Sequence, residues 1–321
     1  MATTNLPMVV YHADWGTAPK KRWLCNAVLE GDGYRAHSPA LVGDHRGFMN
    51  RVKNETGETG AAVVGFDFPI GIPARYAALL GVTEFKPFLL QLGGGDFVDF
   101  YRISVTSSEV SKYRPFYPQA PGRTKHSHLL SALGLTFIDE LRRKCDLAND
   151  VRRAACPLFW TLGANQVGRA AIIGWQDVLA PAVGSDKSVV LWPFDGSLDS
   201  LLKPGNIVVV ETYPAECYCW FFQSEPLRGK GKLEVRRQAG PALLKWAHSA
   251  NVTLAPELRR TIEDGFPNDD AFDATVGLFG MLEVILNRRN SGEPDDEGVR
   301  KIEGWIFGQC YPRRVPVAWG C

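Results

Sequence analysis

Short apolar runs that end in a carboxylate recur along the chain. The runs cover residues 7–14, 61–67 and 206–211, and they end in Asp14, Asp67 and Glu211. Runs of this length, rich in Val and Ile, predict strands, and the second is typical of a strand buried on both faces. Residues 22–30 and 33–37 flank a turn with two glycines and predict an antiparallel pair. The pattern predicts a mixed sheet with acidic strand ends.

Residues 267–286 predict a long helix that is apolar nearly all round, which indicates burial. Asn268 or Asp269 would cap its start. Asp270 lies near the positive end of the helix, where a carboxylate is stabilised. Capping does not explain Asp273, because it lies in the second turn, on the same helix face as Asp270. A carboxylate buried there needs a cation or hydrogen-bond donors.

The middle of the chain has a looser pattern. Residues 74–80, 84–92, 127–145 and 168–179 predict helices, joined by loops rich in Gly and Pro. A basic and aromatic loop, 114–125, could stack on bases or wrap the core of this block. Further helices are expected over 43–56 and 256–263, and a closing element over 303–308. We expect an α/β core of residues 1–75 and 205–321, interrupted by a mainly helical insertion or cap, 76–204.

The composition limits the kinds of partner and compartment but does not indicate a function. The chain has 321 residues, with 36 Lys and Arg against 35 Asp and Glu, so any site for a polyanion must be a local patch. Seven scattered cysteines without CxxC spacing favour a reduced compartment, and Cys217 and Cys219 would share one face of a strand. The start of the chain and the absence of a long apolar run predict a cytoplasmic protein, neither secreted nor membrane-spanning.

The carboxylates form the candidate site. Side chains at the carboxyl ends of adjacent strands can meet in a crevice, and a cluster of carboxylates there repels itself unless it is protonated or bridged by a metal. Oxygen ligands favour Mg²⁺ or Mn²⁺, and two ions about 4 Å apart could promote phosphodiester hydrolysis. The candidate residues are Asp14, Asp67, Glu211, Asp270 and Asp273 for catalysis, all but Glu211 also as metal ligands, and Lys230, Lys232, Arg236 and Arg237 for substrate phosphates. Taken singly, a strand-end Asp is usually a turn or cap residue, and the basic segment could be a solvated loop.

At these residues the chain resembles the DUF429 family of predicted nucleases, which is grouped with the RuvC-like branch of the ribonuclease H superfamily. The resemblance rests on residues 12–16 (HADWG), 65–73 (GFDFPIGIP), 211–216 (ETYPAE) and 269–274 (DDAFDA). It implies a ribonuclease H-like mixed sheet with helices on both faces. It also implies an acidic site formed by Asp14, Asp67, Asp270 and Asp273, with Glu211 as a further candidate.

Three functions remain open on the sequence. The first is a metal-dependent nuclease that cleaves DNA or RNA with two Mg²⁺ or Mn²⁺ ions. The second is an ATP-dependent phosphotransferase of the related actin and sugar-kinase architecture, because residues 14–17 (DWGT) fit a phosphate-binding turn and residues 195–197 (DGS) could form a second loop. The third is a non-catalytic module that binds nucleic acid or a small ligand. The sequence leaves the oligomeric state open.

Overall fold

The computed structural model describes residues 6–149, 152–163, 167–222, 227 and 229–310. The expected core range 205–321 therefore ends in residues, 311–321, that lie outside the described part. Residues 1–5, on which the expectation of an unexported chain partly rests, lie outside it as well.

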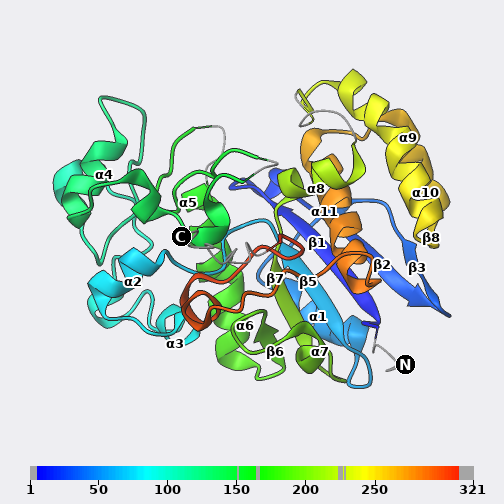
Figure 1. Ribbon diagram of the computed structural model, residues 1–321, viewed down its shortest axis with the longest axis horizontal. Coiled ribbons are helices and arrows are strands. Elements are labelled where there is room, and N and C mark those ends of the chain that lie inside the picture. Colours follow the sequence, from blue (N-terminus) through cyan, green and yellow to red (C-terminus); the bar gives the residue numbers. More distant parts are fainter. Residues whose placement is uncertain (1–5, 150–151, 164–166, 223–226, 228, 311–321) are drawn as a thin grey trace, which may run out of the picture.

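A mixed sheet forms the centre of the molecule (Figure 1). In the described residues its order is β6-β7-β5-β1-β2-β3-β8, with β4 paired to β2. The strands are β1 (Val9–Trp15), β2 (Arg22–Glu30), β3 (Gly33–Ala36), β4 (Ala40–Leu41), β5 (Ala62–Phe66), β6 (Val189–Leu191), β7 (Ile207–Glu211) and β8 (Val252–Leu254). β1, β5 and β7 run parallel, whereas β2 is antiparallel to β1 and β3. The carboxyl ends of β1, β5 and β7 therefore meet at one edge, as the α/β prediction requires.

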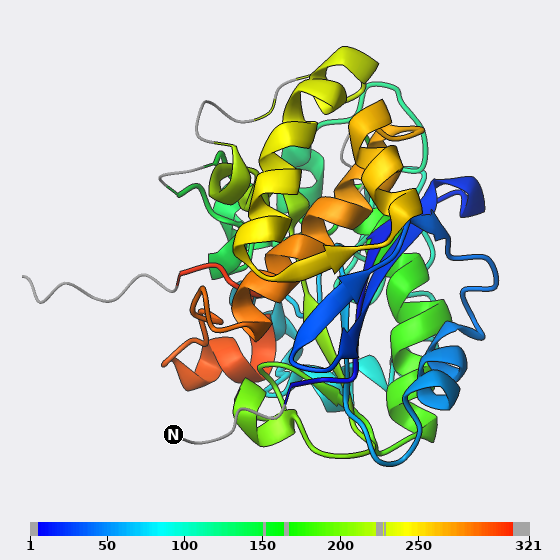
Figure 2. The same cartoon turned by 90° about the vertical axis from the view of Figure 1, so that its right-hand side faces the viewer.

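Helices cover both faces of the sheet (Figure 2). One face carries α1 (Phe48–Thr56), α5 (Val167–Gly174) and α6 (Ala180–Ser185), and the other carries α8 (Pro214–Phe221), α9 (Leu233–Ser249), α10 (Pro256–Asp264) and α11 (Asp269–Ile285). Alternate residues of each central strand join different cores. Tyr11 and Val64 pack on the α1 side, whereas Val10 and Val63 pack on the α11 side.

Helix α11 is buried over nearly its whole length, as its composition predicts. Asn268 is its cap, because its side-chain oxygen accepts the Ala271 N–H at 2.8 Å. Two glycines allow the helix to approach the sheet closely. A Cβ atom on Gly277 would lie 2.2 Å from the His12 ring, and one on Gly65 would lie 2.4 Å from Met281 Sδ. This close approach brings the start of α11 to the ends of β1 and β5.

The region 76–204 differs in part from the expectation. It contains α3 (Phe85–Leu89), α4 (His126–Leu133) and α7 (Leu198–Leu201), and α2 (Ala74–Leu80) leads into it. The helix expected over 127–145 was predicted too long, because Gly134 adopts a left-handed φ of 65° and ends α4. β6 belongs to this region yet pairs with β7, so the block also contributes an edge strand to the sheet.

Two further segments differ from the sequence prediction. Cys217 and Cys219 lie in helix α8 rather than in a strand, and Cys217 is buried while Cys219 is exposed. The 17-residue helix α9 was not predicted, since its charged residues and internal Pro241 conceal its pattern. All six cysteines in the described ranges are free. Over the same ranges, no helix combines the length and the apolar character needed to cross a membrane.

Candidate active site

Asp14 and Asp67 form a carboxylate pair at the carboxyl edge of the sheet. The register of the parallel strands pairs Ala13 with Phe66, so the next residue of each strand lies beside the other on the α11 face. The two carboxyl groups are in hydrogen-bonding contact. Asp67 Oδ1 also accepts the backbone N–H of Trp15 at 2.6 Å. The pair is therefore fixed by the backbone rather than by flexible loops.

The environment of this pair favours protonation. Burial raises the pKa of Asp67 to about 6, although the Trp15 N–H and Asp14 oppose the shift. Burial also raises the pKa of Asp14 well above its usual range, and the negative charges of Asp67 and Asp273 raise it further. The Asp14–Asp67 pair therefore keeps a proton to a higher pH than two solvent-exposed aspartates would.

Asp273 supplies the third carboxylate from the second turn of α11. It is only 6% exposed. The Tyr218 hydroxyl donates to Oδ1, and the Lys230 ammonium pairs with Oδ2. Burial raises the pKa of Asp273, and Lys230 and Tyr218 oppose the rise. The charge of Asp273 raises the pKa of both Asp14 and Asp67, so the three carboxylates belong to one electrostatic cluster.

Lys230 places a cation directly within this acidic cluster. Its side chain is 34% exposed, and its ammonium also lies over the Tyr218 ring, 5.8 Å from the centroid. Burial lowers the pKa of this amine, but the charges of Asp273 and Asp14 outweigh that effect and raise it. Arg236 fixes the same segment, because its Nη1 donates to the Lys230 carbonyl at 2.7 Å.

Asp270 lies at the rim of the cluster. It is half-buried, and its Oδ2 is 3.9 Å from Lys21 Nζ. Burial raises the pKa of Asp270, whereas the charge of Lys21 lowers it. Its charge also contributes to the raised pKa of Asp14, after those of Asp67 and Asp273. Asp270 is therefore coupled to the cluster through charge, from a more solvated position.

Glu211 lies apart from this cluster, contrary to the expectation that it would join it. Side chains alternate between the two faces of β7, and Val209, two residues before Glu211, packs in the α1-side core. Glu211 instead forms a two-pronged ion pair with the fully buried Arg143, at 2.5 and 2.6 Å. It also accepts the Ile70 N–H at 2.6 Å. Arg143 in turn pairs with Asp146, so Glu211 ties the insertion to the sheet.

The other three basic candidates do not point to the carboxylates. Arg236 is buried, and its remaining bonds go to the carbonyls of Gly265 and Phe266. Arg237 donates to the Asp264 carbonyl at 3.1 Å. Lys232 is exposed just before α9. Of the four basic residues predicted to bind substrate, Lys230 is the one placed at the cluster.

His12 was not predicted as part of the site, although it lies two residues before Asp14 in β1. Its ring is completely buried, and burial lowers its pKa to about 3. Nδ1 lies 3.0 Å from the Ala274 carbonyl and must donate to it, so Nε2 accepts from the Thr212 hydroxyl at 2.8 Å. A neutral His12 thereby joins β1, β7 and α11 directly beneath the carboxylates. Its apolar neighbours in the sequence gave no sign of this role.

The turn after Asp14 offers few groups to a nucleotide phosphate. The Trp15 N–H is donated to Asp67, and the Gly16 N–H to the Lys21 carbonyl at 3.1 Å. A Cβ atom on Gly16 would lie 2.5 Å from Lys21 Cβ, so the turn is tightly packed. In the second candidate loop, Asp195 accepts the Leu191 N–H. These bonds account for both loops as structural turns.

Comparisons with family models, curated proteins and solved structures returned no match for this chain. A function for this chain therefore has to be inferred from the geometry of the site.

The donor set fits a hard divalent cation at Asp14 and Asp67. Their oxygens are the ligand type that Mg²⁺ and Mn²⁺ prefer, and a cation there would offset the cost of burying their negative charge, which raises the pKa of both residues. In the described ranges no group of three or more His, Cys, Asp or Glu side chains is already arranged around one point. The position of Lys230 gives a physical reason, since its ammonium pairs with the oxygen that Asp273 would offer to a metal.

Proposed function

We propose that this chain is a metal-dependent nuclease that hydrolyses phosphodiester bonds of DNA or RNA. One observation carries the proposal: two buried carboxylates, Asp14 and Asp67, touch at the ends of neighbouring parallel strands, and the charge of a third buried carboxylate, Asp273 on helix α11, raises the pKa of both. Such a cluster is costly to bury, and stability alone gives no reason to retain it.

The sheet supports the ribonuclease H-like part of this proposal. An antiparallel β1-β2-β3 meander lies next to the parallel strands β5 and β7, and helices cover both faces. The family resemblance implies this arrangement, with acidic residues on the first strand, a later strand and the final long helix. Membership of the DUF429 family is part of the proposal and rests on the motifs and on this agreement.

Each residue of the cluster would have a distinct part. Asp14 and Asp67 would hold the divalent ion, which would supply water activation and stabilisation of the leaving oxygen. Asp273 would orient Lys230, whose ammonium can neutralise a bound phosphate. Tyr218 fixes the Asp273 carboxylate through its hydroxyl. His12 stays neutral and holds α11 against β1 through the Ala274 carbonyl.

Two ions were expected, and the geometry favours one at the Asp14–Asp67 pair. A second ion beside Asp273 would have to displace the Lys230 ammonium from Oδ2. An ammonium cannot activate a metal-bound water, but it can supply the positive charge that a second ion would otherwise bring to the phosphate. We therefore propose one divalent cation assisted by Lys230 as the resting arrangement.

The test is cleavage of single- and double-stranded DNA and RNA with Mg²⁺ or Mn²⁺. Asp14→Asn should abolish cleavage, while Asp32→Asn, in the exposed β2–β3 turn, should leave it unchanged. Retained cleavage in Asp14→Asn would refute the assignment. Calorimetric titration with Mn²⁺ then separates a nuclease from a binding module, because a module of that kind needs no ion at the carboxylates.

A further inference from the structure

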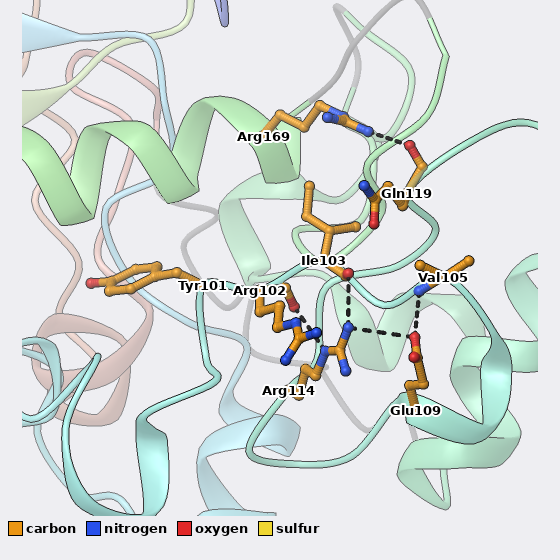
Figure 3. A pocket seen from close by; sticks show the side chains of 8 residues that line it. All are labelled: Tyr101, Arg102, Ile103, Val105, Glu109, Arg114, Gln119 and Arg169. Carbon is orange, nitrogen blue, oxygen red and sulfur yellow. Dashed lines mark hydrogen bonds and ion pairs between the residues drawn. The ribbon is translucent and has the colours of Figure 1, made fainter.

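A second polar site lies in the insertion, where a pocket of about 470 Å³ is lined by three arginines (Figure 3). Arg102 and Arg114 lie on its lower side in this view, and Arg169 reaches in from the start of α5. Ile103 lies between them, whereas the Tyr101 ring points away from the arginines. Glu109 is the one acidic residue of the lining. The pocket therefore carries an excess of positive charge.

Two of these guanidinium groups are held in place by the backbone. Arg114 donates from Nε to the Arg102 carbonyl at 3.3 Å and from Nη2 to the Ile103 carbonyl at 3.0 Å, and the same Nη2 lies 3.4 Å from Glu109 Oε2. Arg169 donates from Nε to the Thr161 carbonyl at 3.1 Å, and from Nη2 to that of Gln119. Within the described ranges neither Nη1 has a hydrogen bond. Donors fixed in this way lose little conformational entropy when they bind a ligand.

The charge of the surrounding segment points the same way. Residues 100–125 contain five Lys and Arg against one Glu, in a chain that has 36 Lys and Arg and 35 Asp and Glu overall. The aromatic residues of the loop 114–125 do not add a stacking surface, since Phe116 and Tyr117 are buried in the core of the insertion. The loop therefore contributes charge to the surface and packing to the interior.

We propose that this arginine pocket binds a phosphate group of a nucleic acid strand. Forked guanidinium groups recognise phosphate oxygens with paired hydrogen bonds, and basic contacts of this kind position a strand without reading its sequence. The choice of a strand as ligand rests on the proposed nuclease function, whereas the recognition of phosphate rests on the pocket alone. The substrate contacts expected from Lys232, Arg236 and Arg237 are thereby assigned to the insertion instead.

The experiment measures binding of a fluorescent single-stranded oligonucleotide in EDTA, where the acidic site has no divalent ion. Arg102→Gln should weaken binding about 5- to 10-fold and reduce the salt dependence by about one phosphate contact. Lys112→Gln is the matched control, because Lys112 lies in the same segment but packs over the Tyr113 ring outside the pocket. It should change binding less than about twofold.

Arg169→Lys keeps the charge and loses the fork, so it should also weaken binding if the geometry matters. Inorganic pyrophosphate should compete with the oligonucleotide. Comparison of 5′-phosphorylated and 5′-hydroxyl oligonucleotides shows whether the ligand is a terminal phosphate or an internal diester, and either result supports the pocket.

The inference is overturned if the wild-type chain does not bind, or if Arg102→Gln and Lys112→Gln have equal effects. If the wild type cleaves nucleic acid and Arg102→Gln binds the oligonucleotide as tightly as the wild type, the phosphate pocket is refuted but the nuclease function is not. If the wild type binds the oligonucleotide through the pocket but does not cleave it, the nuclease function is refuted but the pocket is not.

Discussion

Replacement of Asp67 by Asn should stabilise the metal-free protein. The amide oxygen can still accept the Trp15 N–H, which Asp67 now accepts at 2.6 Å. The amide nitrogen can donate to Asp14, so that the hydrogen bond between the two side chains no longer requires a protonated carboxyl group. The same change removes one of the charges that raise the pKa of Asp14. A substitution in the proposed active site should therefore increase the free energy of unfolding.

The magnitude follows from the pKa of Asp67. A rise from 3.8 to about 6 corresponds to at most about 3 kcal/mol of lost folding free energy at pH 7. A raised carboxyl pKa leaves stability intact below pH 3.8, lowers it as the pH rises to about 6, and has a constant effect above that. The difference between Asp67→Asn and wild type should therefore be near zero at pH 4 and reach about 1–3 kcal/mol at pH 7.

Urea denaturation in EDTA at pH 4, 5, 6 and 7 measures this difference. Asp67→Ala is the control, because it removes the charge but leaves the Trp15 N–H without its acceptor, which costs about 1–3 kcal/mol. Addition of Mg²⁺ should stabilise the wild type and leave Asp67→Asn unchanged. If Asp67→Asn is no more stable than wild type at pH 7 in EDTA, burial of the ionised Asp67 carboxylate does not cost stability and the argument for the site fails.

Three further substitutions test the surrounding structure. Arg143→Met should lower the free energy of unfolding in urea by about 3–5 kcal/mol, because it leaves buried carboxylates without their cation. Gly277→Ala should lower the free energy of unfolding by about 1–3 kcal/mol, since the new methyl group meets the buried His12 ring. Gly122→Ala, whose new methyl group enters open space, is the control and should have little effect in the same denaturation assay. Lys230→Met should strengthen Mn²⁺ binding in calorimetry, because the Asp273 oxygen becomes available, and unchanged Mn²⁺ binding would contradict the proposed competition.

The local pattern of the sequence predicted the sheet and helix α11 well. Apolar runs and glycine turns mark β1, β2, β3, β5 and β7, and these strands carry Asp14 and Asp67 to the same edge. Asp273 was predictable because a buried second-turn carboxylate needs a partner. The nature of that partner was not predictable. Lys230 is 43 residues away from Asp273 in the sequence and reaches it only through the tertiary fold. Long-range pairs of this kind leave no periodic signal.

Glu211 shows how a strand can mislead when both of its faces are buried. All five residues of β7 are buried, so their polarity does not reveal which of them face α11. The register resolves this ambiguity: Glu211 lies opposite Phe66, whereas the site requires the position opposite Asp67. Thr212 occupies that side of the strand and binds His12. A shift of one residue therefore separates a carboxylate at the proposed active site from one that binds Arg143 and stabilises the insertion.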